Sequence, residues 1–308
     1  MQYTDGKSYY SLNQYLRDHF GEKLYKLALD GGMSCPNRDG TLDTRGCIFC
    51  SGQGSGDFAA DRSLSVTEQI NSQIRRMEQK RPGIHSYIAY FQAFTNTHAP
   101  VSYLRGIFTE AIRHPAVKVL SVATRPDCLE PEKIALLQEL NQRKPVWVEL
   151  GLQTSNDATA AYLRRGYPLS CFDDAVYRLR EAGLETIVHV ILGLPGESRQ
   201  DLLSTIRHCN ALPLQGIKLQ LLHVLKGTDL ANDYLAGKFE TLEENNYIDL
   251  VIDCLEHLRP DMVIHRVTGD GPKKLLIAPT WSCAKRNVLN HLHREMKLRG
   301  SRQGKESI

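Results

Sequence analysis

Six short runs of apolar and β-branched residues recur along the chain, and longer segments with apolar residues at helical spacing lie between them. Short apolar runs predict buried strands, and strands that alternate with helices form βαβ units around a parallel sheet. The predicted strands are Leu24–Leu29, Tyr87–Phe91, Val117–Ala123, Val146–Leu150, Thr186–Leu192 and Ile217–Leu222. The predicted helices lie near residues 64–80, 101–113, 131–140, 170–182 and 198–210.

Six parallel strands fit an open, partial (β/α)6 barrel of the TIM-like type better than a closed barrel of eight strands. We assign this core to residues 1–227 and a C-terminal helical extension to residues 228–308. The extension has predicted helices near 243–258 and 284–299, with a short apolar run at Met262–Val267 between them. In such α/β folds, functional residues lie at the carboxyl ends of the strands.

The composition, with 42% hydrophobic and 24% charged residues among 308, is typical of a globular protein with a large core. Charges interrupt every hydrophobic run, so we predict no membrane span, and the N-terminus lacks the pattern of an export signal. We therefore expect a cytoplasmic protein whose eight cysteines stay reduced. Four cysteines that occur singly are expected to be small buried hydrophobes: Cys128, Cys171, Cys209 and Cys254.

Three other cysteines, Cys35, Cys47 and Cys50, lie in a loop at residues 30–51, directly after the first predicted strand. A structural zinc site needs four closed ligands, and no second Cys-x-x-Cys pair exists. A redox dithiol would use Cys47 and Cys50 but leave Cys35 without a role. Three thiolates fit a [4Fe–4S] cluster with one iron left open for S-adenosylmethionine (SAM), and we favour this over both alternatives. For Cys283, a structural thiol and a role at the site both stay open.

A series of motifs in fixed order carries a family resemblance over nearly the whole chain. These motifs are Asp30–Gly32, Ser34–Gly40, Cys47–Cys50, Ala89–Ala93, Ala123–Asp127, Val148–Thr154, Gly193–Glu197, Lys226–Thr228 and His265–Asp270. The chain resembles the radical SAM superfamily, specifically the YtqA/YhcC-type family related to the Elongator catalytic subunit. It departs from the superfamily in the long spacing after Cys35. It also has Tyr167 where many relatives have a histidine, which leaves Arg165 available but no histidine there.

The resemblance implies which residues contact SAM. Backbone carbonyls at the end of the second strand would receive its amino group, and Arg165 would face its carboxylate. Glycine permits close approach of a flat ligand, with Leu194 against the adenine. The predicted SAM-binding residues are Tyr90, Phe91, Gln92, Thr124, Gln153, Arg165, Gly193 and Leu194. Glu149 interrupts an apolar strand, and it is either a group on the substrate side or an ion-pair partner of Lys218.

The net charge of +3 is unevenly distributed, because the segment from Lys285 onward has seven Lys and Arg residues against two Glu. This basic segment is either a solvated terminal helix or a surface that binds tRNA phosphates. The resemblance implies a radical SAM enzyme that modifies wobble uridine in tRNA. The alternatives are a radical SAM enzyme for a small metabolite and, least favoured, a non-enzymatic iron–sulfur protein. An electron donor is required, but the sequence does not identify it.

Overall fold

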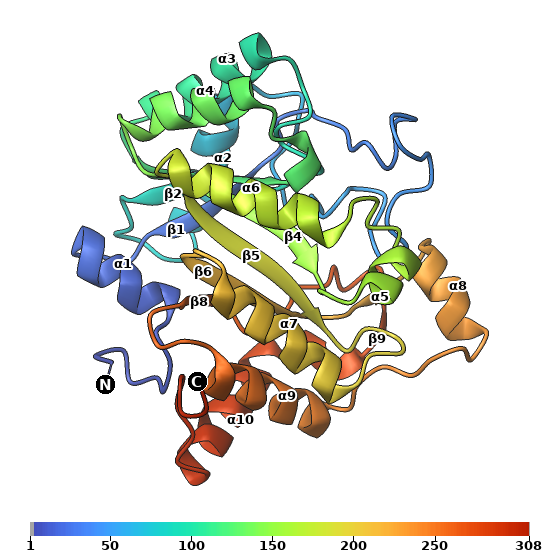
Figure 1. Ribbon diagram of the computed structural model, residues 1–308. Helices are drawn as coiled ribbons and strands as arrows, with labels where there is room; N and C mark the ends of the chain where they lie inside the picture. Colours follow the sequence, from blue (N-terminus) through green and yellow to red (C-terminus); the bar gives the residue numbers. More distant parts are fainter. Residues whose placement is uncertain (1–2, 308) are drawn as a thin grey trace.

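A parallel sheet, curled into a half-barrel, forms the centre of the computed structural model, which describes residues 3–307 (Figure 1). Its strands pair in the order β1-β2-β3-β4-β5-β6-β8, and every pair is parallel. They are β1 (Tyr25–Leu29), β2 (Tyr87–Phe91), β3 (Val117–Thr124), β4 (Val146–Gln153), β5 (Glu185–Leu192), β6 (Gly216–Leu221) and β8 (Val263–Arg266). The predicted partial α/β barrel is therefore confirmed.

The sheet has seven strands where the sequence predicts six. The additional strand, β8, comes from the run that we assigned to the C-terminal extension, and it pairs with β6 through Ile217 and Ile264. A four-residue strand that follows two helices carries no local sign of which sheet edge it joins. The extension thus completes the barrel wall.

Helices cover the outer face of the sheet, as the alternating pattern predicts (Figure 1). Two of them, α2 and α7, begin with capping boxes formed by Ser65 with Glu68 and by Ser198 with Asp201. The predicted helices correspond to α2 (Val66–Glu78), α3 (Val101–Arg113), α4 (Pro131–Asn141), α6 (Leu169–Glu181), α7 (Arg199–Ala211), α9 (Glu244–His257) and α10 (Lys285–Leu298). The sequence analysis did not predict α1 (Leu12–Phe20), α5 (Asp157–Tyr162) or α8 (Asp229–Leu235).

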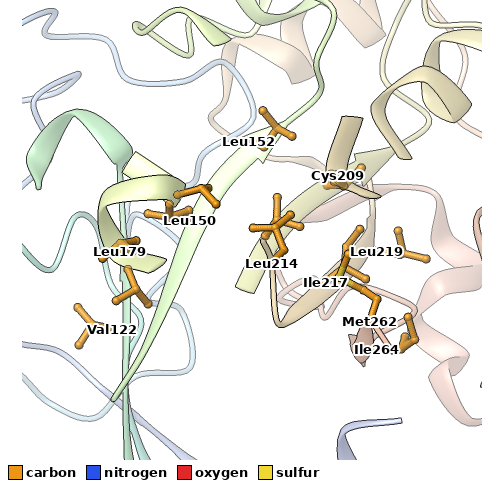
Figure 2. Packing of buried hydrophobic residues seen from close by; sticks show 14 of the residues in the cluster. Val122, Leu150, Leu152, Leu179, Cys209, Leu214, Ile217, Leu219, Met262 and Ile264 are labelled. Carbon is orange, nitrogen blue, oxygen red and sulfur yellow. The ribbon is translucent and has the colours of Figure 1, made fainter. Parts of the chain in front are cut away.

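The main hydrophobic core lies between the sheet and these outer helices. Side chains alternate between the two faces of a strand, so every second residue points outward. Val122 and Leu150 point this way and lie near Leu179 of α6, whereas Leu219 lies near Ile217 in another part of the same core (Figure 2). Three of the four singly occurring cysteines, Cys128, Cys209 and Cys254, are buried as predicted, and Cys171 is half-buried.

The inward side chains form two layers of opposite character. The layer at the amino ends of the strands is apolar, and it contains Ile88, Val119, Trp147, Ile187 and Val263. Helix α1 closes this end, with the Tyr15 and Trp147 ring centroids 6.0 Å apart. The layer two residues further along the strands is polar, and it contains Tyr90, Ser121, Glu149, His189 and Lys218. A charged layer thus forms the floor of the carboxyl end of the barrel.

The C-terminal segment is fixed to the body of the protein. After α10, the Gln303 side chain accepts a hydrogen bond from the Tyr10 amide (2.8 Å) and donates to the Met262 carbonyl (2.8 Å). A short antiparallel ribbon of β7 (Val224–Leu225) and β9 (Leu276–Ala278) precedes α10. No helix in residues 3–307 is long and apolar enough to cross a membrane.

Candidate active site

A cleft of about 270 Å³ opens at the carboxyl ends of the barrel strands. Its walls come from the cysteine loop, from the ends of β2 to β6 and from the segment around the β7–β9 ribbon. The cysteine loop, drawn in blue, lies on the same side of the molecule as α5 and α8 (Figure 1). The cleft therefore lies where parallel α/β sheets place their functional residues.

Cys35, Cys47 and Cys50 all line this cleft and are partly exposed to it. Tight turns bring them together: the Arg38 amide donates to the Cys35 carbonyl (2.7 Å), and the Cys50 amide donates to the Cys47 carbonyl (3.1 Å). The Arg38 guanidinium then donates to the carbonyls of Cys50 (2.7 Å) and Ser51 (2.8 Å). One arginine thus ties the two ends of the cysteine loop together.

Asn37 connects the loop to the segment after α5. Its amide nitrogen donates to the Arg164 carbonyl (2.7 Å) and lies 3.4 Å from Cys47 Sγ. Gly166 lies against it with a φ of +83°, and a Cβ there would be 2.7 Å from Asn37 Oδ1. Glycine suits this position because other residues are strained at such a φ and would displace Asn37.

We expect Gly166→Ala to reduce the iron bound per chain severalfold after reconstitution, because displaced Asn37 would shift Cys47. Gly183→Ala is the matched control, since Gly183 has a φ of +71° and open space around it. Iron and sulfide analysis measures the effect. Equal iron content in the two variants would contradict this account of Gly166.

The three thiols fit a cluster that binds each cysteine through a different iron. Burial raises the pKa of Cys47, and burial together with the neighbouring Cys47 raises the pKa of Cys50 to about 12. Bound iron would favour their thiolate forms, since metal binding deprotonates cysteine. Within residues 3–307, no three His, Cys, Asp or Glu side chains are grouped closely enough to hold a single metal ion. The thiols around a cluster are held further apart than the ligands of one ion.

Two arginines enclose an aromatic ring beside the cysteines. The guanidinium carbons of Arg125 and Arg165 lie 4.9 and 5.0 Å from the centroid of the Tyr167 ring. Asp127 holds Arg125 through two hydrogen bonds of 2.9 and 2.7 Å. The Tyr167 hydroxyl donates to the carbonyl of Gly151. The tyrosine that departs from the family pattern is therefore an integral part of this wall.

Two buried polar atoms in the cleft wall have no hydrogen-bond partner among the described residues: Gln153 Oε1 and Arg165 Nη2. Arg165 Nη1 donates to the carbonyls of Leu152 (3.1 Å) and Thr154 (2.7 Å), whereas Nη2 makes no hydrogen bond and lies 3.7 Å from Asp157 Oδ1. Gln153 has a φ of +67° at a β-bulge, a strained backbone that often accompanies function. An unpaired donor and an unpaired acceptor fit a ligand with both carboxylate and amino or hydroxyl groups, as SAM has.

The structure brings five of the eight predicted SAM-binding residues to the cleft and leaves three outside it. Tyr90, Gln92, Thr124, Gln153 and Arg165 line the cleft. The Phe91 ring points to the outer helices, with its centroid 5.0 Å from that of Phe108, so only its backbone is available. Leu194 is buried in a cluster with Ile48, and a Cβ on Gly193 would meet Leu242. Leu194 therefore packs against the cysteine loop, and Gly193 leaves room for the Leu242 side chain.

Glu149 lies at the floor of the cleft and has four hydrogen-bond donors around it. Lys26 Nζ (2.6 Å) and Ser121 Oγ (2.8 Å) donate to one oxygen, while Lys218 Nζ and His189 Nε2 (2.7 Å) contact the other. Glu149 therefore pairs with Lys218, as one of the two alternatives predicts, and it also lines the cleft. A role towards the substrate stays a prediction.

The protonation states of this floor follow from burial and from its charges. Burial opposes ionisation of Glu149, but Lys218 and Lys26 outweigh it and hold the pKa of the carboxylate well below its usual range. Burial and the Lys218 charge lower the pKa of His189 to about 4. Burial also lowers the pKa of His223, on the cleft wall, to about 4. At neutral pH the floor therefore combines an ionised carboxylate with neutral imidazoles.

Low pH should destabilise the fold through these histidines. In the unfolded chain they take up protons below pH of about 6.5, whereas in the folded chain His189 and His223 do so only near pH 4. Stability is therefore lost as pH falls between these values. We expect the double variant His189→Gln/His223→Gln to reduce this loss in urea unfolding between pH 7 and pH 5. His85→Gln, at an exposed position, should leave the loss unchanged.

Two residues of the site, Lys26 and Arg38, were not predicted to have a role there. Lys26 interrupts the first apolar strand just as Glu149 interrupts the fourth, so the same signal was present. Arg38 acts through a contact with carbonyls twelve and thirteen residues away, which no local pattern predicts.

Family models match most of the chain. Residues 44–209 match the Radical SAM superfamily, and residues 214–298 match the Radical_SAM C-terminal domain. The chain belongs to the radical SAM superfamily, whose members are enzymes that use SAM and a [4Fe–4S] cluster. It is 48% identical over 300 residues to the uncharacterized protein YtqA of Bacillus subtilis, covering 97% of this chain and 92% of that protein. The resemblance predicted from the motifs is confirmed.

Three further comparisons extend the similarity to other proteins. It is 36% identical to YhcC of Escherichia coli K12 over 86% of this chain and 85% of that protein. It is 29% identical to the tRNA uridine(34) acetyltransferase of Dehalococcoides mccartyi, but over only 55% of this chain and 37% of that protein. The structure of Methanocaldococcus infernus Elp3 has the same fold, with a TM-score of 0.69 at 16% identity, covering 91% of this chain and 64% of that one.

Proposed function

We propose that this radical SAM enzyme modifies the wobble uridine of tRNA, with a [4Fe–4S] cluster bound by Cys35, Cys47 and Cys50. One observation carries the proposal: three cysteines, two orphaned polar groups and a charged floor converge on a single cleft. The similarity to a tRNA uridine(34) acetyltransferase supports the choice of substrate. We propose the cytoplasm as its compartment, where thiols stay reduced and tRNA is present.

When bound, the cluster and SAM supply a 5′-deoxyadenosyl radical that abstracts hydrogen from the substrate. Asn37 and Arg38 hold the cysteine loop in position for the cluster. Arg165 Nη2 would bind the SAM carboxylate, and Gln153 Oε1 would accept a hydrogen bond from the amino or ribose groups of SAM. Lys218 Nζ and His189 Nε2 hold protons at the floor, next to the place of the substrate.

The charged groups around Tyr90 support a role for the floor of the cleft in substrate binding. Tyr90 belongs to this floor, with the Lys26 and Lys218 ammonium groups 4.5 and 4.6 Å from its ring centroid. Lys218 donates to the Tyr90 hydroxyl at 3.2 Å. A substrate above Tyr90 would meet hydrogen-bond donors below it and the cofactors beside it.

The test is an anaerobic reaction of the reconstituted protein with dithionite, SAM and bulk tRNA that lacks wobble-uridine modifications. We expect 5′-deoxyadenosine together with a mass shift at the wobble uridine in digested tRNA. The Cys50→Ala variant, treated in the same way, should give neither product.

The alternatives give different results in the same reaction. Deoxyadenosine without a change in tRNA mass would overturn the tRNA substrate and favour a small metabolite. No deoxyadenosine, from protein with full iron content, would point to an iron–sulfur protein that does not cleave SAM. The electron donor is replaced by dithionite here, so its identity does not affect the outcome.

A further inference from the structure

Three of the seven Lys and Arg residues in the basic C-terminal segment pair with acids from elsewhere in the fold. Arg299 pairs with Asp249 (2.7 Å), and Lys305 pairs with Glu256 (3.3 Å), both acids being supplied by α9. Lys285 pairs with Asp270 at 2.6 Å. The far end of the segment is also tied to the amino-terminal segment through Gln303, whereas the cleft opens at the carboxyl ends of the strands. These pairs reduce the charge of the segment, and its far end is held away from the cleft.

A different group of cations lies at the rim of the cleft. Lys226, Lys273 and Lys274 are exposed at the connecting end of the β7–β9 ribbon. No carboxylate among residues 3–307 lies within 4.0 Å of their ammonium groups. Their chain neighbours Leu225 and Pro272 line the cleft itself. Three cations without acidic partners therefore stand beside the entrance to the site.

The backbone that carries these lysines is firmly held. The Lys226 amide donates to the Leu275 carbonyl (2.8 Å), which pairs the two sides of the ribbon. Before the ribbon, Gly269 lies so close to His223 that an added Cβ would be 2.7 Å from its ring. Asp270 is fixed between Arg266 (3.4 Å) and Lys285 (2.6 Å). The lysines thus extend from a fixed base.

The cleft mouth also offers an aromatic group. Phe58, in the loop after the cysteines, lines the cleft and is 49% exposed. Proteins that bind single-stranded nucleic acid combine cations along the backbone with aromatic rings on which bases stack. A nucleotide whose base entered this cleft would leave its adjoining phosphates at the rim.

We propose that the ribbon lysines, Lys226, Lys273 and Lys274, bind the phosphates that flank the nucleotide inserted into the cleft. This proposal rests on the proposed RNA substrate. It replaces the far half of the basic C-terminal segment as the principal phosphate contact, because the ribbon lysines are exposed next to residues that line the cleft.

The test compares two triple variants of the reconstituted enzyme: Lys226→Gln/Lys273→Gln/Lys274→Gln and, as a control of equal charge, Arg294→Gln/Lys297→Gln/Arg302→Gln. All three control residues are exposed in or after α10. Binding of tRNA is measured by fluorescence anisotropy at several salt concentrations. Each phosphate contact contributes about 0.9 to the slope of log K against log salt. The ribbon variant should therefore lose a slope of about 2 to 3 and on the order of 100-fold in affinity near 0.1 M salt.

The control variant should bind within about threefold of the wild type, and both variants should cleave SAM at the wild-type rate without tRNA. Wild-type affinity and salt slope in the ribbon variant would overturn the ribbon proposal alone. If the wild type itself fails to bind tRNA, both the RNA substrate and the role of the ribbon are overturned. An equal loss in the two variants would show diffuse attraction by surface charge, which also contradicts a local phosphate site.

Discussion

Replacing either Cys47 or Cys50 with alanine should abolish cluster binding and all SAM cleavage. Both thiols line the cleft, and with Cys35 they are the cysteines that we propose as cluster ligands. Loss of one of three thiolates leaves two irons without protein ligands, so the cluster should not persist. The measurements are the brown absorbance, iron and sulfide per chain, and 5′-deoxyadenosine formed with dithionite.

Cys171→Ala is the matched control for these variants. Cys171 is also partly exposed, but it lies on α6 outside the cleft. This variant should keep the iron content and SAM cleavage of the wild type. Full cluster content in Cys47→Ala or Cys50→Ala would refute the ligand assignment, whereas loss in all variants would indicate a general folding defect.

Glu149→Gln should reduce the free energy of unfolding by about 3 to 5 kcal/mol, because it leaves buried Lys218 and partly buried Lys26 without a counter-charge. The double variant Glu149→Gln/Lys218→Gln should recover part of this loss, since it removes one of the unpaired ammonium groups. Urea unfolding under anaerobic conditions measures both effects.

Glu139→Gln provides the comparison at the surface. Glu139 pairs with Arg105 at 2.7 Å, and both side chains are nearly half exposed. Surface pairs contribute at most about 1 kcal/mol, so this variant should unfold almost like the wild type. Similar losses for Glu149→Gln and Glu139→Gln would mean that the floor of the cleft is well solvated and that its charges are not strongly coupled.

The C-terminal segment is more basic in the sequence than in the folded protein, because acids from elsewhere in the chain pair with part of it. A count along the chain includes only Glu295 and Glu306 within that segment. The acids of α9 and the loop before β9 approach it only in the folded chain. Charge patterns in sequence therefore locate basic segments but do not measure the charge that remains available to a partner.

Some of the predicted SAM-binding residues are positioned by the local strand pattern, and others by contacts with distant segments. Tyr90 and Phe91 point to opposite faces of the strand because successive side chains alternate, so only the Tyr90 side chain reaches the cleft. The positions of Gly193 and Leu194 depend instead on contacts with Leu242 and Ile48, which come from distant segments. No pattern within the motif at 193–197 contains that information.

The sequence by itself determined the parallel α/β sheet, its outer helices and the three cysteines near one strand end, because these depend on local periodicity and spacing. Only the tertiary structure decided that β8 completes the wall, that Lys26, Glu149 and Lys218 meet at one floor, and that the ribbon lysines stand unpaired at the entrance. These features depend on which distant segments become neighbours. Which segments become neighbours depends on the packing of the whole chain, because the free energy of burying a charge or an apolar side chain depends on all the groups around it.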